Sequence, residues 1–299
     1  MNILVTGGAG FIGSEVVDLL IGRSYEVTVW DDFSTGKEEN LLPRPGLTVR
    51  TCDVADPDTW PKDRYISNYD VVVHCAAKTK VIYCDENPVE AWKTNVYATQ
   101  KLAEACPNAR FVFLSTLGAM YSGPVLNERT PPKPIGMYGL SKLYSETALK
   151  AIHPNFASLR LSNVFGERQR PDNEGGVVSI FLGAYREGEA LTIFGDGNQT
   201  RDFIYVKDVA RTVVTAAESA VLNETFHVNY GESHSVNQLA DAIKEVSQID
   251  VIYKDARPGE LYEVKFPSHS QARSLLGFEP SISVLDFIRD QVTKWRDEK

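Results

Sequence analysis

Two side chains four residues apart, Tyr138 and Lys142, could together supply a general base. Residues at i and i+4 share one face of an α-helix. An unperturbed phenol has a pKa near ~10, which is too high for a base at neutral pH. A neighbouring cation favours the phenolate and lowers that pKa. The pair therefore predicts proton abstraction by Tyr138, assisted by Lys142.

The same Tyr-x-x-x-Lys spacing occurs a second time, at Tyr97 and Lys101. The surroundings of the two pairs differ. Tyr138 follows a strand pattern that ends in Ser115 and Thr116, and doubly wound sheets hold their ligands at the carboxyl ends of strands. Tyr97 lies inside a long helical pattern with no such hydroxyl before it. We therefore predict that Tyr138 is catalytic and that Tyr97 is a packing or interface residue.

Three glycines near the start, Gly7, Gly10 and Gly13, have G-x-x-G-x-x-G spacing. The motif follows a strand pattern and begins a helical one, which is the context that a dinucleotide-binding motif requires. Gly7 permits the tight turn, Gly10 lets the backbone approach a pyrophosphate, and Gly13 allows close packing of helix on strand. The backbone N–H groups at the helix start would then bind the phosphates.

The acid expected after such a motif is Asp31, at the end of the second strand pattern. A carboxylate there accepts hydrogen bonds from the adenosine ribose and repels a 2′-phosphate, so NAD is predicted rather than NADP. Lys37 lies close in sequence and leaves NADP as the alternative. Asp53 could accept from the adenine amino group, or could be a loop or capping carboxylate. The positive nicotinamide ring would join Lys142 in favouring the Tyr138 phenolate.

The elements that must position these residues alternate between strand and helix patterns. Six strands are predicted, at Ile3–Thr6, Glu26–Trp30, Leu47–Thr51, Val71–Cys75, Arg110–Ser115 and Ala157–Leu161. Three helical segments lie between them, at Phe11–Ile21, Pro88–Ala105 and Met137–Ala151. This alternation predicts an α/β fold with a Rossmann-type, doubly wound parallel sheet. Residues 1–165 would form the NAD-binding domain, and residues 166–299 a smaller α/β substrate-binding lobe. The boundary is soft, and the chain can cross between the lobes.

Composition restricts the function classes. The chain has 299 residues and a net charge of −9, with no basic stripe, so a nucleic-acid partner is not expected. The longest apolar runs are too short to span a bilayer, and no signal segment is evident, so a cytoplasmic protein without membrane contact is predicted. The four cysteines lack C-x-x-C spacing and are predicted to be reduced. The five histidines are scattered, so no metal site is predicted.

With both motifs in register, the chain resembles the extended short-chain dehydrogenase/reductase family, in its NAD-dependent nucleotide-sugar epimerase/dehydratase branch. The resemblance covers nearly the whole chain. Its further motifs are Asp31–Gly36, His74–Ala77, Asn95-Val96, Arg160–Gly166, Gly195–Phe203, Arg257–Glu260 and Leu276–Pro280.

The resemblance implies the site residues and the assembly. The cofactor would contact Gly7, Gly10, Phe11, Ile12, Gly13, Asp31, Asp32, Phe33, Ser34, Thr35, Gly36, Asp53, Val54, Ala76, Ala77, Asn95, Ser115, Tyr138 and Lys142. The nucleotide sugar would contact Thr116, Asn163, Val178, Phe194, Arg201 and Arg257. Arginine suits paired phosphate oxygens, although each arginine could instead form a surface salt bridge, and Phe194 could belong to a core strand. A homodimer through the Pro88–Ala105 and Met137–Ala151 helices is expected.

One segment departs from the family pattern. Family members carry two small hydroxyl residues, two variable residues and then Val-Tyr-Gly, whereas this chain has Ser115–Ser122. Thr116 or Leu117 falls at the position that hydrogen-bonds the sugar hydroxyl. Leucine cannot form that bond, so Thr116 is predicted. The Asp-Glu pair of the dehydratases and the Glu of the decarboxylases are both missing from this segment.

The chemistry that remains is oxidation at C4 followed by its reversal. We therefore predict a nucleotide-sugar 4-epimerase acting on UDP-glucose and UDP-galactose or their N-acetylated forms, through a 4-keto sugar. By resemblance Val264 or Lys265 would gate the N-acetyl pocket. A dehydratase, 2-epimerase or ketoreductase of the same family is the alternative. A non-catalytic NAD-sensing regulator would not need both Tyr138 and Lys142.

Overall fold

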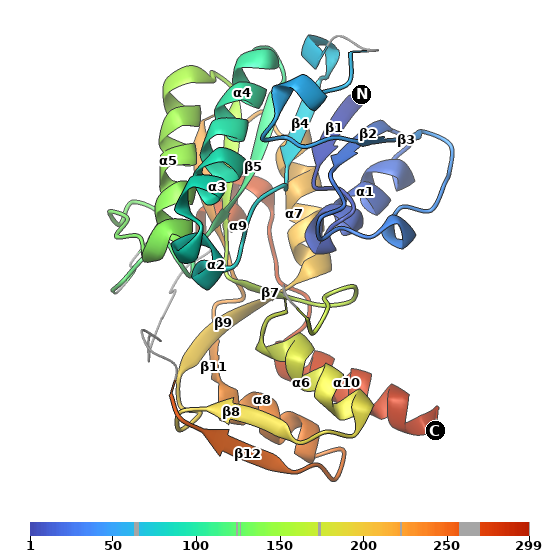
Figure 1. Ribbon diagram of the computed structural model, residues 1–299, viewed down its shortest axis with the longest axis vertical. Helices are drawn as coiled ribbons and strands as arrows, with labels where there is room; N and C mark the ends of the chain where they lie inside the picture. Colours follow the sequence, from blue (N-terminus) through green and yellow to red (C-terminus); the bar gives the residue numbers. More distant parts are fainter. Residues whose placement is uncertain are drawn as a thin grey trace.

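The computed structural model describes residues 1–62, 66–123, 125, 127–172, 175–221, 223–256 and 270–298, and all structural statements concern these. They form two lobes (Figure 1). The upper lobe contains a large sheet covered by helices on both faces. The lower, smaller lobe contains short strands and the helices α6 (Val177–Glu187), α8 (Val236–Lys244) and α10 (Val284–Asp297).

The large sheet has seven strands, and each pairing in it is parallel. In the order β3-β2-β1-β4-β5-β6-β10, its strands are Leu47–Thr51, Glu26–Asp31, Asn2–Thr6, Val71–His74, Arg110–Thr116, Phe156–Leu161 and Glu224–Val228. The first six follow the order of dinucleotide-binding sheets. The predicted doubly wound parallel sheet is therefore confirmed, and each of the six predicted strands differs by at most one residue at an end.

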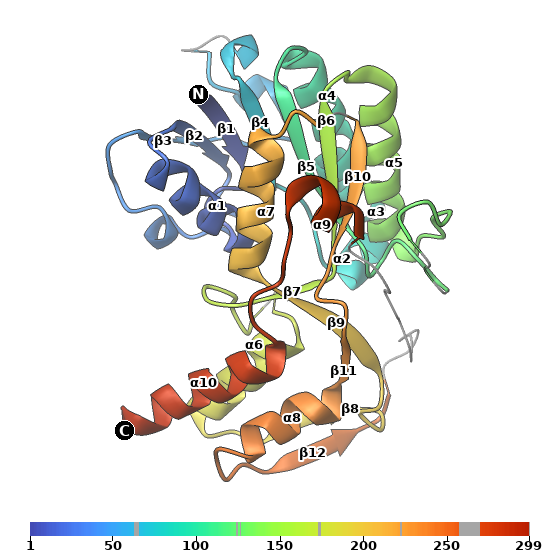
Figure 2. The same ribbon diagram turned by 180° about the vertical axis from the view of Figure 1, so that it is seen from behind.

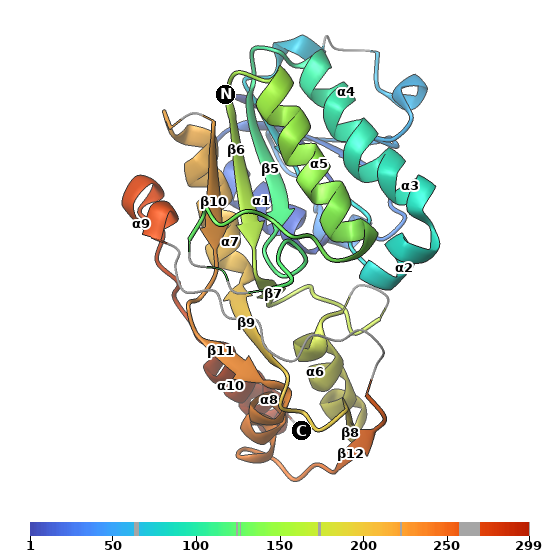
Figure 3. The ribbon, with the colours of Figure 1, turned by 90° about the vertical axis from the view of Figure 1, so that its left-hand side faces the viewer.

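Successive side chains of a strand point to opposite faces of the sheet, so an apolar core forms on each face. Ile3 and Val5 belong to the core under α1 (Phe11–Gly22), α7 (Val206–Glu218) and α9 (Ser270–Leu276). Between them, Leu4 belongs to the core on the opposite face. Helices α4 (Ala98–Ala105) and α5 (Gly136–Ile152) cover that opposite face, where Figure 3 shows them side by side.

The predicted helix at Pro88–Ala105 is interrupted. It consists of α3 (Pro88–Trp92), a π-helical turn at Lys93–Tyr97 and α4. The carbonyl oxygen of Asn95 in the π-helical turn accepts hydrogen bonds from the hydroxyls of Thr99 and Ser145, at 2.6 and 2.7 Å. Widened turns of this kind often occur at functional sites. The change in helix type brings Asn95 against α5.

The lower lobe has its own apolar core. Its helices are α6 (Val177–Glu187), α8 (Val236–Lys244) and α10 (Val284–Asp297). Strands β8 (Leu191–Phe194) and β12 (Val251–Lys254) pair in parallel. A three-stranded sheet of β11 (Ser233–Ser235), β9 (Thr200–Tyr205) and β7 (Asn163–Phe165) leads into this lobe.

The chain passes between the lobes several times after residue 165. Helix α7, strand β10 and helix α9 pack in the upper lobe, although α6 and β8 precede them in the lower one (Figure 2). The remaining elements are short: α2 (Val81–Glu86) and 3-10 turns at Glu38–Asn40, Pro57–Thr59 and Ile66–Asn68. The carboxyl ends of β5 and β6 face the lower lobe (Figure 3). Both lobes therefore border the region where the predicted site residues gather.

Candidate active site

The turn between β1 and α1, together with the first residues of α1, forms a glycine cradle at Gly7–Gly13. Two of its glycines are needed for the chain to turn so tightly. Gly7 has φ +67°, and a Cβ there would lie 2.6 Å from the backbone nitrogen of Ala76. A Cβ on Gly13 would lie 2.1 Å from the carbonyl oxygen of Gly7. Gly10 is the N-cap of α1 and contributes no side-chain cap to the first helical turn. An anion can therefore meet backbone N–H groups at the start of α1.

Asp31 closes the cradle from the end of β2. Its carboxylate accepts hydrogen bonds from the backbone nitrogens of Ala9 and Phe33, at 2.8 and 2.9 Å. Burial raises the pKa of Asp31, and these two hydrogen bonds oppose the shift. A Cβ on Gly36 would lie 2.8 Å from this carboxylate, so the loop after β2 folds back against it. Asp31 thus lies beside the glycine turn, where the adenosine ribose is predicted to bind.

The other predicted cofactor residues lie along the same edge of the sheet. Phe11 and Ile12 begin α1, Asp32–Gly36 follow β2, Asp53 and Val54 follow β3, Ala76 and Ala77 follow β4, and Ser115 is the second-last residue of β5. The side chain of Asp53 accepts from the nitrogen of Ala55 at 2.8 Å. The hydroxyl oxygen of Ser115 is buried and has no hydrogen-bond partner among the described residues. A polar group of NAD at this edge would satisfy it, so the residues present fit the cofactor.

Helix α5 carries Tyr138 and Lys142 to the carboxyl end of β5. The Nζ atom of Lys142 donates to the carbonyl oxygen of Leu114 at 2.8 Å and lies 4.8 Å from the centre of the Phe113 ring. Burial lowers the pKa of Lys142 to about 8. Burial also raises the pKa of Tyr138 to about 12, and a hydrogen bond with the Thr116 hydroxyl opposes this shift. The protein groups alone therefore do not produce the lowered phenol pKa that we expected from Lys142.

The structure distinguishes Thr116 from Leu117. Thr116 is in the hydrogen bond with Tyr138, and its hydroxyl also accepts from the backbone nitrogen of Ala119 at 3.3 Å. Leu117 has no exposed surface and packs in a separate apolar cluster with Met120. Of the two residues left open by the sequence, Thr116 is therefore the one beside the phenol.

The alternative pair lies elsewhere. Tyr97 belongs to the π-helical turn, and 38% of its surface is exposed. Lys101 lies 5.8 Å from the centre of the Tyr97 ring and forms an ion pair with Glu104. Tyr97 and Lys101 therefore lie on an exposed helix face, whereas Lys142 is buried.

Asn95 links two segments of the site. Its Oδ1 atom accepts from the backbone nitrogen of Lys78 at 2.8 Å, and its Nδ2 atom donates to the oxygen of Lys78 and to the hydroxyl of Ser141. Ser141 directly precedes Lys142. Asn95 therefore positions α5 against the loop after β4, and its contact with the cofactor stays a prediction.

The sequence analysis missed a buried network beyond Lys142 on helix α5. Glu146, one turn beyond Lys142, pairs with Arg160 of β6 at 2.6 Å. The same guanidinium donates to the hydroxyl of Tyr121. The spacing of Glu146 from Tyr138 and Lys142, four residues per step, was a signal that could have placed it on the buried face of α5.

The predicted substrate residues come from the junction and the lower lobe. Asn163 donates to the backbone oxygen of Asp202 at 3.0 Å, which places it beside Arg201. Phe194 borders an open pocket of about 660 Å³ together with Tyr253. Arg257, Glu260, Val264 and Lys265 lie outside the described residues.

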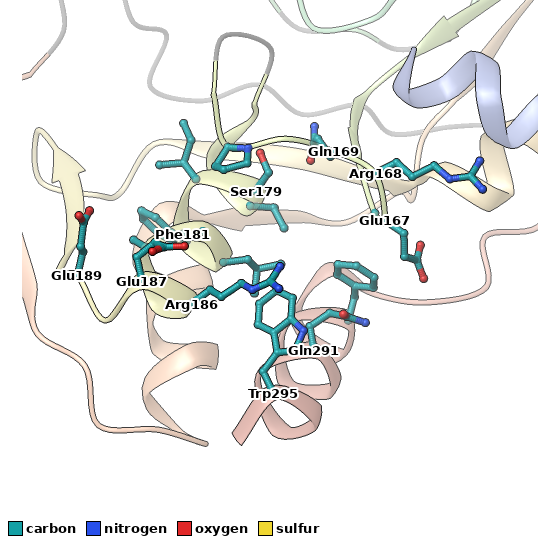
Figure 4. Close-up of a pocket in the computed structure, with 18 of the residues that line it drawn as sticks. Glu167, Arg168, Gln169, Ser179, Phe181, Arg186, Glu187, Glu189, Gln291 and Trp295 are labelled. Carbon is teal, nitrogen blue, oxygen red and sulfur yellow. The ribbon is translucent and has the colours of Figure 1, made fainter. Parts of the chain in front are cut away.

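A second pocket, in the lower lobe, lies away from Tyr138 and Lys142. Its volume is about 590 Å³, and Val178 of α6 lines it (Figure 4). In this view Arg186 of α6 lies beside Trp295 of α10, and its guanidinium is 5.6 Å from the ring centre. Val178 is also part of the core of the lower lobe, so its predicted substrate contact stays untested.

Two general features concern the described residues only. None of the described helices is long and apolar enough to cross a membrane. In the same part of the chain, no group of three or more His, Cys, Asp or Glu side chains could hold a metal ion.

The chain is similar to known proteins in both sequence and fold. Residues 3–231 match the model of the NAD dependent epimerase/dehydratase family. The UDP-glucose 4-epimerase of Mycolicibacterium smegmatis is 32% identical, over 100% of this chain and 99% of its own. The structure of Thermotoga maritima UDP-glucose 4-epimerase with UDP-glucose has a TM-score of 0.89 and 35% identity, covering 100% of this chain and 99% of that one.

A second solved structure is similarly close. It is the UDP-N-acetylglucosamine 4-epimerase of Methanobrevibacter ruminantium in complex with UDP-N-acetylmuramic acid, with a TM-score of 0.89 and 33% identity, covering 99% of this chain and 98% of that one. The cradle, the tyrosine–lysine helix and the family match agree, and this chain is a member of the NAD dependent epimerase/dehydratase family.

Proposed function

We propose that this protein interconverts the C4 epimers of a UDP-hexose with NAD as its cofactor. The observation that carries the proposal is the hydrogen bond between Thr116 and Tyr138, on a helix that also carries Lys142. The turn after Thr116 contains Leu117, Gly118 and Ala119 and therefore has no acid or base. Such a site can remove and return a proton at one hydroxyl, but it has no second group to expel water.

In this proposal Tyr138 accepts the proton of the C4 hydroxyl, and Thr116 orients that hydroxyl and relays its proton. Lys142 holds positive charge on the same helix face. When bound, NAD supplies the acceptor and donor of the C4 hydride and a positive charge beside the phenol. The 4-keto sugar turns over in the pocket before the proton and hydride return to it.

The glycine cradle would hold the cofactor pyrophosphate and Asp31 its ribose. Asn163, Val178, Phe194, Arg201 and Arg257 would hold the nucleotide sugar. The similarity to epimerases of UDP-glucose and of UDP-N-acetylglucosamine supports a UDP-hexose. Either UDP-glucose and UDP-galactose or their N-acetylated forms would be the pair that is interconverted.

The test supplies the purified protein with NAD and with a panel of UDP-, dTDP-, CDP- and GDP-hexoses, and follows the products by NMR. Inversion at C4 of a UDP-hexose without net NADH is the expected result. Loss of water, an accumulating keto sugar or stoichiometric NADH would contradict the proposal.

We further expect a homodimer through the outer face of α3 and α5. Three large apolar side chains on this face are exposed: Val89 by 68%, Trp92 by 38% and Tyr144 by 48%. The rings of Trp92 and Tyr144 lie 5.0 Å apart and form one apolar patch. A patch of this kind is typical of a protein interface. The four free cysteines support a reducing compartment, and we place the enzyme in the cytoplasm.

A further inference from the structure

The turn that follows β5 determines which way the Thr116 hydroxyl can point. Within this turn Met120 donates its backbone N–H to the oxygen of Leu117 at 3.2 Å. The backbone nitrogen of Ala119 donates to the hydroxyl oxygen of Thr116 at 3.3 Å. A hydroxyl has one proton and two acceptor positions. Ala119 therefore uses one acceptor position, which leaves the proton for Tyr138 and one acceptor position for a substrate hydroxyl.

Helix α5 touches this turn at Gly139, the residue after Tyr138. A Cβ at position 139 would lie 2.1 Å from the carbonyl oxygen of Ala119 and 3.0 Å from its carbonyl carbon. No real side chain tolerates a contact of 2.1 Å, so helix and turn meet here backbone to backbone. Tyr138 is therefore next to a residue whose backbone contacts the turn after Thr116.

Further hydrogen bonds tether the turn to other segments of the chain. The carbonyl oxygen of Ala119 accepts from the backbone nitrogen of Ile135 at 2.9 Å, and that of Met120 accepts from Lys133 at 3.0 Å. Tyr121, which ends the turn, is buried, and its hydroxyl accepts from the guanidinium of Arg160. A side chain at position 139 would therefore push α5 away from the turn or distort a tethered segment.

We propose that Gly139 and Ala119 are a positioning pair for the catalytic hydroxyl: the close contact sets the separation of Thr116 and Tyr138, and the Ala119 N–H fixes Thr116 as the donor to the phenol. This inference rests on the proposed function, because it requires Thr116 and Tyr138 to act on the substrate. It gives a role to two residues outside the predicted site, and it explains how a hydroxyl at Thr116 serves in a turn where Leu117 faces the interior.

The test is a double-mutant cycle of Gly139→Ala and Thr116→Val, measured as kcat and KM for the epimerised UDP-hexose. A misplacement of about 1 Å can reduce a rate about 100-fold, so kcat of Gly139→Ala should fall by about that factor with little change in KM. In the Thr116→Val background Gly139→Ala should cause no further loss, because it acts through the missing hydroxyl. The apparent pKa in the kcat profile of Gly139→Ala should also rise, because the phenolate loses its hydrogen bond.

Two further variants keep the test decisive. Gly22→Ala is the matched control, since Gly22 ends helix α1 and a Cβ there meets nothing within 4 Å; its kcat should equal that of the wild type. If Gly139→Ala does not fold, as judged by NAD binding and thermal unfolding, Ala119→Pro removes the N–H donor directly. It should lower kcat and raise the same apparent pKa.

The outcomes separate the two proposals. Wild-type kcat in folded Gly139→Ala, or an equal loss in both backgrounds, would overturn the positioning pair while leaving the epimerase proposal intact. Where Gly139→Ala does not fold, wild-type kcat in Ala119→Pro would overturn it likewise. A wild-type protein without C4 epimerase activity would instead overturn the proposed function.

Discussion

Arg160 of β6 and Glu146 of α5 are joined by three hydrogen bonds of 2.6 to 3.2 Å in the interior of the upper lobe. Both side chains are more than nine-tenths buried. Replacement of Arg160 by Met should lower the free energy of unfolding by about 3–5 kcal/mol, because the Glu146 carboxylate is left buried without its partner. Urea unfolding measures this loss. The double variant Arg160→Met, Glu146→Met should recover part of it; a single variant as stable as the wild type would contradict the expectation.

Replacement of Tyr138 by Phe should abolish turnover and preserve NAD binding, because it removes the phenol oxygen and leaves the glycine cradle intact. Turnover is measured by NMR and NAD binding by fluorescence titration. Tyr97→Phe is the matched control, since Tyr97 has the same spacing to a lysine but lies on an exposed helix face. Retained turnover in Tyr138→Phe would show that the wrong tyrosine was assigned.

Replacement of Asp31 by Asn should weaken NAD binding about 10- to 100-fold, because a charge-assisted hydrogen bond contributes about 1.5–3 kcal/mol. The preference for NAD over NADP should also shrink, since the carboxylate no longer repels a 2′-phosphate. Dissociation constants for both cofactors test this. Glu26→Gln, at the exposed opposite end of β2, is the control. Unchanged affinities in Asp31→Asn would exclude a ribose contact.

His74 should make stability depend on pH in the acid range. Burial lowers the pKa of His74 to about 3, well below the usual value of about 6.5 for histidine, so the folded protein keeps this ring neutral. Between pH 6.5 and 3 the unfolded chain binds a proton that the folded chain does not, and the free energy of unfolding therefore falls as the pH falls. Between pH 6.5 and pH 5 the uptake of this one proton lowers the free energy of unfolding by about 2 kcal/mol.

The variant His74→Asn tests this linkage. Its stability at pH 7 should be lower, because the ring bonds to Thr6 and Thr99, at 2.6 and 3.0 Å, are lost. Between pH 6.5 and 5 the free energy of unfolding of this variant should fall less than that of the wild type. The difference should equal the contribution of one histidine. Equal losses in both proteins over this range, measured by urea unfolding, would refute the assignment.

The double variant Trp92→Glu, Tyr144→Glu should convert a dimer into a monomer, because two charges in an apolar interface are costly to bury. Light scattering coupled to gel filtration measures the mass. Ile252→Glu, on the exposed strand β12, is the control for a charge placed on a different apolar surface, and it should leave the mass unchanged. A wild-type protein that elutes as a monomer would contradict the expected dimer.

Much of the upper lobe could be predicted because its signals are local. The alternation of Ile3, Leu4 and Val5 and the glycine spacing are properties of neighbouring residues, and the structure places all of them as expected. The π-helical turn at Lys93–Tyr97 could not be predicted in the same way. It depends on hydroxyl donors from Ser145, which is 50 residues away along the chain.

The sequence by itself determined the α/β class of the upper lobe, because strand and helix patterns alternate along it. It also placed Tyr138 and Lys142 on one helix face, because their spacing is i, i+4. The sequence favoured Thr116 over Leu117 because leucine cannot form a hydrogen bond, and the tertiary structure placed Thr116 beside the phenol and Leu117 in an apolar cluster. The close approach of the turn after β5 to Gly139 is a contact between backbones, which no side-chain pattern records. Tertiary structure also decided the direction of both pKa shifts, because burial raises the pKa of Tyr138 and lowers the pKa of Lys142.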